Sequence, residues 1–342
     1  MSTADASSTQ IHLAHRPTGW PTHDDFRTVV VALPDLQPGE VRVRNELLSV
    51  DPYMRGRMNA GRSYVPPYEL DEVMTGAAIG RVVASRAEGV QEGDVVTHQL
   101  GWRDVAQAPA DAFRTVPEVP GVPLSAHLGV LGVTGFTAWL GLTEIAGLRE
   151  GDVVFVSGAA GAVGSVAGQL AKLKGASRTI GSAGGPEKLR LLTERYGYDV
   201  GLDYKASPIR EQLVAATGTE QGEGIDVYFD NVGGDHLEAA LEVFNDGGRA
   251  ALCGAIAGYN DEQRTPGPNN LWHVITRGLT LRGFTVLTWF RFFPAFVTEV
   301  TPWVAEGRIV SDETFHEGID SAVDAFLDLM RGGNTGKMLV RL

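Results

Sequence analysis

The stretch that decides the fold runs from Asp152 to Gly164 and reads Asp-Val-Val-Phe-Val-Ser-Gly-Ala-Ala-Gly-Ala-Val-Gly. Its first part, Asp152–Val156, is apolar after the first residue, as a strand buried on both faces of a parallel sheet should be. Beyond the glycine-rich turn, apolar residues recur at helical spacing, namely Val163, Val166, Ala167, Leu170 and Ala171. A strand, a glycine-rich turn and a helix in this order predict a nucleotide-binding βα unit.

The turn resembles the dinucleotide-binding pattern Gly-x-Gly-x-x-Gly. Gly161 and Gly164 fit the pattern, whereas Ala159 stands at the position of its first glycine. Gly161 would let the backbone approach a pyrophosphate, and Gly164 would let the helix pack closely on the strand. The N–H groups and positive dipole end of a helix start would hold the phosphates. A tight turn without a ligand has a similar composition, but the flanking strand and helix favour a nucleotide site.

Strands and helices alternate along the chain from about residue 129. The pattern predicts strands near 179–180, 225–229, 249–253 and 281–286. It also predicts helices over 186–197 and from 237 through 244 to a stop at 247–248. Such alternation is typical of a doubly wound parallel sheet.

The first 125 residues have a different texture, with short strands separated by Pro and Gly. Candidate strands lie at 29–31, 41–44, 79–83 and 94–96. No helix pattern alternates with them, which predicts a compact, mostly β domain. Beyond residue 303, the pattern predicts a helix near 323–330 and a strand at 338–340.

Composition narrows the function classes. The chain has 342 residues, which suits two domains, and its 43% hydrophobic content allows a sizeable core. A formal charge of −13 disfavours nucleic acid as a partner. No apolar run reaches the roughly 18 residues of a membrane helix, and the first ten residues do not read as a signal peptide. We therefore expect a cytoplasmic protein without a membrane partner.

The end of the second strand bears on the choice between NAD and NADP. NAD-binding domains usually carry Asp or Glu there, to bond the ribose 2′-hydroxyl. Here Ile180–Gly185 holds no carboxylate, and Lys188 follows shortly. A carboxylate would repel a 2′-phosphate, whereas Lys188 suits one, although a solvated helix lysine is also common. The sequence predicts NADPH rather than NADH.

Several motifs together resemble one family. They are Ala159–Val166, Tyr228–Gly234, Cys253–Ile256, Asp51–Arg55 and the pair Gly336 and Lys337. They are similar to the zinc-independent alkenal/one reductase branch of the medium-chain dehydrogenase/reductase superfamily. That branch includes prostaglandin reductase (leukotriene B4 dehydrogenase), plant double-bond reductases and curcumin reductase. The likeness extends from about residue 39 to the C-terminal end.

The resemblance implies an α/β fold of two domains and a homodimer. Residues 126–300 would form a Rossmann NADP-binding domain with a doubly wound parallel sheet. Residues 1–125 and 301–342 would form a mostly β, GroES-like catalytic domain. The implied activity is NADPH-dependent reduction of the carbon–carbon double bond of an α,β-unsaturated ketone or aldehyde, with hydride added to the β-carbon.

The resemblance also implies roles for individual residues. Gly161, Ala162, Val163 and Gly164 would cradle the pyrophosphate, and Lys188 and Tyr204 would meet the 2′-phosphate. Asn231, Cys253, Gly254, Ala255, Ile256, Tyr259, Phe284, Thr285, Val286 and Asn334 would line the rest of the cofactor. Tyr53 and Tyr259 would face the substrate as catalytic residues. We expect Tyr259 to donate a hydrogen bond to the enolate oxygen, where charge develops, with Tyr53 as the rival donor.

The residues do not predict a metal site. The chain has one cysteine, Cys253, and eight scattered histidines. Where the zinc alcohol dehydrogenases carry Gly-His-Glu, Met74–Ala78 reads Met-Thr-Gly-Ala-Ala. Since no Cys or His group has ligand spacing, His98, His127, His236 and His273 are interpreted as structural or surface residues.

Two alternatives stay open. A quinone reductase of the same superfamily would use the same cofactor site, and a non-catalytic NADPH-binding structural protein would keep it without turnover. Two segments match no pattern of the branch, namely Arg62–Leu70 and Trp289–Phe293. They either border the pocket and set the substrate range, or make core or dimer contacts.

Overall fold

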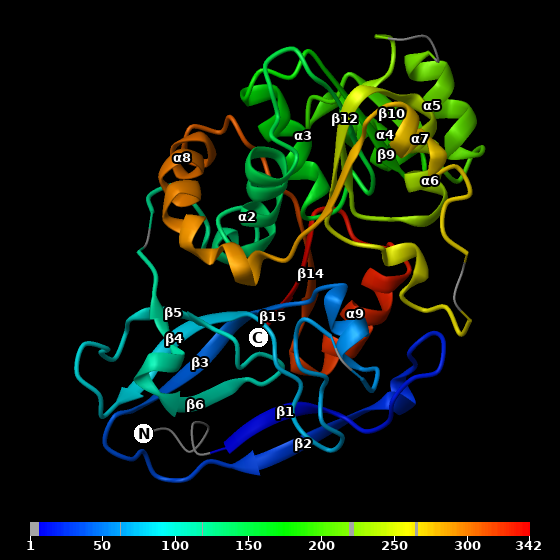
Figure 1. The fold of residues 1–342 in the computed structure, drawn as a ribbon. Helices are drawn as coiled ribbons and strands as arrows, with labels where there is room; N and C mark the ends of the chain where they lie inside the picture. Colours follow the sequence, from blue (N-terminus) through cyan, green and yellow to red (C-terminus); the bar gives the residue numbers. More distant parts are fainter. Residues whose placement is uncertain (1–6, 62, 118, 219–221, 264–265) are drawn as a thin grey trace. The chain divides into compact units, whose positions relative to one another are not determined.

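The computed structural model describes residues 7–61, 63–117, 119–218, 222–263 and 266–342. The chain forms two compact units (Figure 1). Unit 1 comprises Met1–Leu128 together with Glu313–Leu342, and unit 2 comprises Gly129–Asp312. Unit 2 is continuous in sequence, whereas unit 1 is assembled from two distant parts of the chain.

Helix α8 (Phe293–Ala305) explains why the break between the units lies after Asp312 rather than near residue 301. The expected boundary at 301 falls inside this helix. Within unit 2, Phe296 of α8 packs against Phe136 and Trp139 of α2 (Val133–Leu140), with ring centroids 5.6 and 6.3 Å apart. The whole of α8 therefore belongs with unit 2.

Within the described part of unit 2, six parallel strands form one sheet in the order β10-β9-β8-β11-β12-β13. The strands are β8 (Val153–Val156), β9 (Arg178–Ala183), β10 (Val200–Asp203), β11 (Ile225–Asp230), β12 (Phe244–Leu252) and β13 (Thr280–Gly283). Besides α2 and α8, the helices are α3 (Gly164–Leu173), α4 (Pro186–Glu194), α5 (Ile209–Thr217), α6 (Gly234–Val243) and α7 (Trp272–Thr276). Numbered from β8, this order is 3-2-1-4-5-6, that of a Rossmann domain, so the predicted doubly wound parallel sheet is confirmed.

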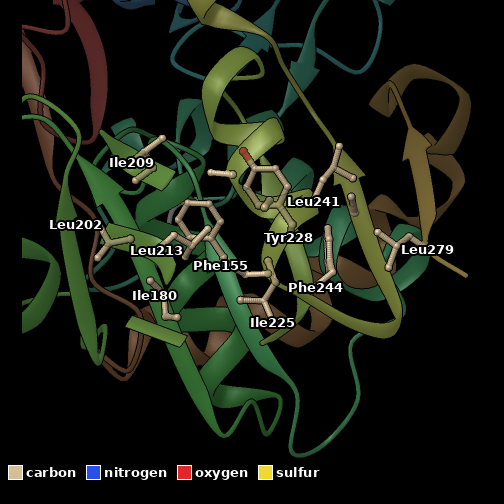
Figure 2. Close-up of a cluster of buried hydrophobic side chains, with 14 residues drawn as sticks. Phe155, Ile180, Leu202, Ile209, Leu213, Ile225, Tyr228, Leu241, Phe244 and Leu279 are labelled. Atoms are coloured by element: carbon tan, nitrogen blue, oxygen red, sulfur yellow. The ribbon is translucent and has the colours of Figure 1, made fainter. Parts of the chain in front are cut away.

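The core of unit 2 explains why the central strands are apolar throughout. Phe155 of β8 and Tyr228 of β11 are buried, and their rings stack with centroids 5.0 Å apart (Figure 2). Leu213 of α5 and Leu241 of α6 pack into the same cluster. The sheet is thus held by apolar side chains from its strands and from the helices that connect them.

Several predicted elements of unit 2 have wrong ends, among them α6 and β13. The helix expected through residue 244 stops at Val243, because Phe244 already begins β12, where it pairs with Ile225 of β11. The strand expected over 281–286 ends at Gly283, and a short 3-10 helix begins at Val286. The run Trp289–Phe293 continues that helix into α8, and Phe293 is buried against Phe136.

Unit 1 is mostly β, as predicted. Within its described residues, one sheet has the order β14-β15-β3-β4-β5-β7, with β6 also paired to β3, and β1 and β2 form a separate antiparallel pair. The strands are β1 (Ser7–Leu13), β2 (Phe26–Ala32), β3 (Glu40–Ser49), β4 (Ala78–Ser85), β5 (Val95–His98), β6 (Val105–Pro109), β7 (Arg114–Thr115), β14 (Glu313–Glu317) and β15 (Lys337–Arg341). The helices are α1 (Tyr53–Arg57) and α9 (Ala322–Met330).

Strand β15 joins the two parts of unit 1. It pairs in parallel with β14 and antiparallel with β3, so residues from 313 onward complete a sheet that begins near residue 40 (Figure 1). Leu339 of β15 packs in one cluster with Leu47 and Ile79. In the described ranges, no helix is long and apolar enough to span a bilayer.

Of the buried histidines, His98 and His236 have pKa values that lie far below the ordinary value. In unit 1, His98 Nε2 lies 2.7 Å from Asn45 Oδ1, and His98 Nδ1 accepts the Leu100 N–H at 3.0 Å. Burial, followed by the charge of Arg103, lowers the pKa of His98 to about 3. In unit 2, burial lowers the pKa of His236 on α6 to about 4. Both histidines therefore resist protonation in the folded protein.

We expect the free energy of unfolding to fall as the pH drops from 6.5 toward 4.5. The unfolded chain binds a proton at each histidine near pH 6.5, whereas folded His98 and His236 do not, so acid favours the unfolded state. Each histidine contributes a slope of up to about 1.4 kcal/mol per pH unit. Urea unfolding at pH 7 and pH 5 measures the effect, and His236→Leu should reduce the slope. Equal stability at both pH values would contradict it.

Candidate active site

The residues expected to bind the cofactor within unit 2 lie beyond the carboxyl ends of the strands. Gly161–Gly164 follow β8, Lys188 lies on the helix after β9, and Tyr204 follows β10. Asn231 follows β11, Cys253–Ile256 and Tyr259 follow β12, and Phe284–Val286 follow β13. All the strands are parallel, so these segments share one edge of the sheet. The strand order reverses between β8 and β11, which is where such sheets bind dinucleotides.

The turn between β8 and α3 is shaped by close backbone packing. Gly158 has φ +62°, a conformation that favours glycine, so it makes the tight turn for which the pattern offered only Ala159. A Cβ on Gly164 would overlap Gly158 O and lie 2.7 Å from Ala159 Cα. At Gly161, a Cβ would meet only Gly158 O, at 3.3 Å. Gly164 therefore serves the packing of α3 on β8, whereas the packing at Gly161 is less tight.

A buried hydrogen-bond network holds the ends of β8 and β11, and sequence reasoning missed it. Asp230 Oδ1 accepts hydrogen bonds from Tyr228 OH (2.7 Å), Ser157 Oγ (3.1 Å) and the N–H groups of Val232 (2.9 Å) and Gly233 (2.8 Å). Burial raises the pKa of Asp230, against these hydrogen bonds, which lower it. Asn231 Nδ2 donates to Ser157 O at 2.8 Å. The network fixes the backbone on both sides of the switch point.

The loop after β12 packs on the loop after β11. The N–H groups of Cys253 and Gly254 donate to Asp230 O, at 2.8 and 3.0 Å. Tyr259 is half-buried, and its hydroxyl accepts the Ala255 N–H at 3.4 Å. Burial raises the pKa of Tyr259, so the phenol keeps its proton and can donate it in a hydrogen bond.

The end of β9 carries a feature that the sequence pattern did not show. Asp203, at the end of β10, pairs in register with Ala183 of β9, so a carboxylate does lie beside the second strand. Its Oδ1 accepts hydrogen bonds from the N–H groups of Gly185 (2.9 Å) and Lys205 (3.0 Å). A Cβ on Gly184 would lie 2.8 Å from both Tyr204 OH and Lys205 Cε. The side chains of Tyr204 and Lys205 thus cover this strand end. The rings of Tyr204 and His236 are in edge-to-face contact, with their centroids 5.5 Å apart.

Two family models match the chain. One, described as the N-terminal domain of oxidoreductase, covers residues 9–116, and the other, described as zinc-binding dehydrogenase, covers residues 162–305. The chain is 38% identical to the NADPH-dependent curcumin reductase of Escherichia coli, over 96% of this chain and 95% of the relative. It is 36% identical to the 2-alkenal reductase (NADP(+)-dependent) of Nicotiana tabacum, over 98% of both.

A solved structure, that of CurA from Vibrio vulnificus in complex with NADPH, superposes with a TM-score of 0.90 at 38% identity, covering 97% of this chain and 98% of that one. The chain belongs to the alkenal/one reductase branch of the medium-chain dehydrogenase/reductase superfamily. The resemblance inferred from the motifs is therefore confirmed.

In this alkenal/one reductase, motifs from both ends of unit 1 meet. Lys337 is buried, and its Nζ donates to Asp51 Oδ1 at 3.0 Å and to Val50 O at 2.8 Å. Asp51 stands just before α1, whose first residue is Tyr53, so the ion pair anchors α1 to β15. Asn334 is also buried, and its Nδ2 donates to Gly336 O at 2.7 Å. The roles of Tyr53 and Asn334 toward substrate and cofactor stay predictions.

The described ranges contain no cluster of side chains suited to bind zinc. There, no group of three or more His, Cys, Asp or Glu side chains lies together in a way that could hold a metal ion. Burial raises the pKa of Cys253 to about 12, so its sulfur is held as the thiol, whereas metals bind thiolate. The expected absence of zinc stays a prediction.

Proposed function

We propose that the protein reduces the carbon–carbon double bond of α,β-unsaturated ketones and aldehydes with NADPH. The observation that carries the proposal is the position of Tyr259. It is a half-buried, neutral hydrogen-bond donor in the loop after β12, on the sheet edge where the cofactor cradle lies. The names of the tobacco and Escherichia coli relatives support this substrate class and cofactor.

The cradle fits a dinucleotide. Gly161–Gly164 would hold the pyrophosphate, because α3 begins there with N–H groups not yet used in the helix and a positive dipole end. Asn231, Cys253–Ile256 and Phe284–Val286 would line the nucleoside and nicotinamide. The absence of a methyl group at Gly161 leaves the space that a pyrophosphate needs. When bound, NADPH supplies the hydride that is added to the β-carbon.

Addition of hydride to an enone leaves negative charge on the carbonyl oxygen. A donor placed at that oxygen stabilises the charge as it develops, and in a water-poor site this effect is large. Tyr259 would serve as this donor, because its oxygen accepts the Ala255 N–H and its own proton remains available. Tyr53, half-buried near Asp51 and with a raised pKa, is the rival donor from unit 1.

Selectivity for NADPH would come from the end of β9. Lys188 and Tyr204 were expected there, and the packing at Gly184 adds Lys205. The hydrogen bonds from Gly185 and Lys205 to Asp203 Oδ1 turn that carboxylate toward the backbone and temper its repulsion of a 2′-phosphate. Lys205, beside Tyr204, therefore supports selectivity for NADPH over NADH. It adds a positive charge to the earlier argument, which was that Ile180–Gly185 holds no carboxylate.

Replacing Lys205 by Met should raise the dissociation constant of NADPH at least about tenfold and leave that of NADH nearly unchanged, because only NADPH carries the 2′-phosphate. Gly184→Ala should act in the same direction without removing a charge, by displacing Tyr204 and Lys205. Lys172→Met, which removes an exposed pair with Asp199, is the matched control. Fluorescence titration measures both cofactors. Equal losses for NADPH and NADH would refute the assignment.

The function itself is tested with a panel of enals, enones, enoyl thioesters and quinones, followed by NADPH absorbance. We expect turnover of enals and enones, with quinones slower. Faster quinone turnover would favour a quinone reductase, and NADPH binding without turnover would favour a non-catalytic protein. The homodimer stays a prediction that sedimentation velocity can test.

A further inference from the structure

The segment 63–70 follows no pattern of the branch, and in the structure it has neither helix nor strand; Arg62 lies outside the described residues. Arg57 is one of the side chains that hold it to unit 1. Arg57 Nε donates to Pro66 O at 2.9 Å, and Arg57 Nη1 donates to Thr75 O and Thr75 Oγ1 at 3.2 and 3.0 Å. The guanidinium thus bridges the two ends of the loop from 66 to 75.

Tyr68 completes this clamp. Its ring lies under the Arg57 guanidinium, with Arg57 Cζ 3.9 Å from the ring centroid. The Tyr68 hydroxyl donates to Thr75 O at 2.7 Å, and the Tyr68 N–H donates to Arg57 O at 2.7 Å. Arg16 adds a hydrogen bond to Tyr68 O at 2.9 Å. Tyr68 is 3% exposed, so the centre of the segment is anchored while its flanks face outward.

The clamp lies beside Tyr53. Tyr53 and Arg57 are four residues apart on α1, so they share one face of the helix. The pKa of Tyr53 is raised first by burial, then by Asp51 and Tyr68, while Arg57 lowers it and Tyr64 raises it slightly. The Tyr68 ring therefore packs against a guanidinium that extends from the same face of α1 as Tyr53. Tyr64, four positions before the anchored Tyr68 in the sequence, exposes 58% of its surface.

We propose that Arg57 is a positioning residue that holds the segment 63–70 as a wall beside Tyr53, and that this wall selects enones with aryl substituents. The inference rests on the proposed function, in which Tyr53 faces the substrate. Tyrosine rings held at fixed positions favour aromatic partners by stacking or edge contacts. A segment without hydrogen-bonded secondary structure keeps such rings in place only if it is clamped, and the fork of Arg57 makes that clamp.

The test compares Arg57→Met with wild type on 4-phenylbut-3-en-2-one and on pent-3-en-2-one. We expect kcat/KM for the aryl enone to fall at least about tenfold, mainly through KM, because its contacts lose their position. For the short enone the change should stay within about threefold, and the NADPH dissociation constant should not change. Chymotrypsin should cleave the native variant after Tyr64 or Tyr68 much faster than wild type, since the segment opens locally.

Arg57→Lys keeps the charge but cannot bridge Pro66 and Thr75, so an intermediate loss is expected. Tyr68→Phe removes only the bond to Thr75 O and should cause a smaller loss in the same direction. Arg81→Met, which removes an exposed ion pair with Glu46, is the control.

The proposal is overturned if the ratio of kcat/KM for the aryl enone to that for the short enone is unchanged in Arg57→Met, which includes an equal loss for both enones. If Arg57→Met does not fold, an unchanged ratio in both milder variants overturns it. A wild-type protein that reduces no enone refutes the proposed function instead, while the cleavage rates still report on the clamp.

Discussion

Tyr259→Phe protein is expected to reduce enones roughly 10²-fold more slowly than wild type at saturating NADPH. The substitution keeps the ring and removes the hydroxyl that would stabilise the enolate oxygen. Loss of one such donor costs about 10²–10³ in rate, and a ribose hydroxyl of the cofactor that shares the oxygen would soften the loss. The measurement is kcat from NADPH absorbance with the enone also saturating.

The NADPH dissociation constant of the same variant separates two roles for Tyr259. If kcat falls and the affinity for NADPH holds, the hydroxyl acts on the substrate. If only the affinity falls, the hydroxyl serves the cofactor loop, where it accepts the Ala255 N–H. An unchanged kcat would exclude Tyr259 as the donor, and Tyr53→Phe would then be the variant to examine.

Gly164→Ala should strongly destabilise unit 2. The new Cβ would overlap Gly158 O and lie 2.7 Å from Ala159 Cα, and backbone atoms cannot move aside as a flexible side chain can. We expect the free energy of unfolding to fall by about 3 kcal/mol or more, with the NADPH site lost as α3 moves off β8. Urea unfolding monitored by circular dichroism measures the loss.

Gly161→Ala is the matched control for that prediction. Its Cβ would meet only Gly158 O at 3.3 Å, so the fold should change little. The methyl would instead occupy the space expected for the pyrophosphate, and the NADPH dissociation constant should rise at least about tenfold. If Gly164→Ala unfolds like wild type, or if Gly161→Ala binds NADPH like wild type, the division of roles between the two glycines is wrong.

The βα unit at 152–164 could be predicted from sequence because its signals are local. A buried strand is apolar on both faces, and an amphipathic helix repeats its apolar residues, so a window of fifteen or so residues suffices. The local signal was less reliable at Phe244. That residue extends a helical pattern, yet its pairing with Ile225 places it in β12. Contacts between strands override local propensity there.

The expected cofactor residues of unit 2 came from the family resemblance, and all of them lie in the segments that follow strands of one parallel sheet. The sequence did not predict the side chains that the register of the sheet brings together. Asp203 lies beside Ala183 only because β10 pairs with β9, and Lys205 reaches the end of β9 only because Gly184 leaves space. Likewise, Asp230 meets Ser157 across 73 positions of sequence. No short pattern encodes such distances.

The place of β15 between β14 and β3 also sets an order of assembly during synthesis. Unit 2 is continuous, so it can fold on the ribosome as soon as its residues have emerged. In the sheet of unit 1, the edge of β3 at Leu47–Ser49 must stay open until Lys337–Arg341 arrive. Throughout translation that edge is a template for pairing with other chains, and aggregation of nascent protein should begin there.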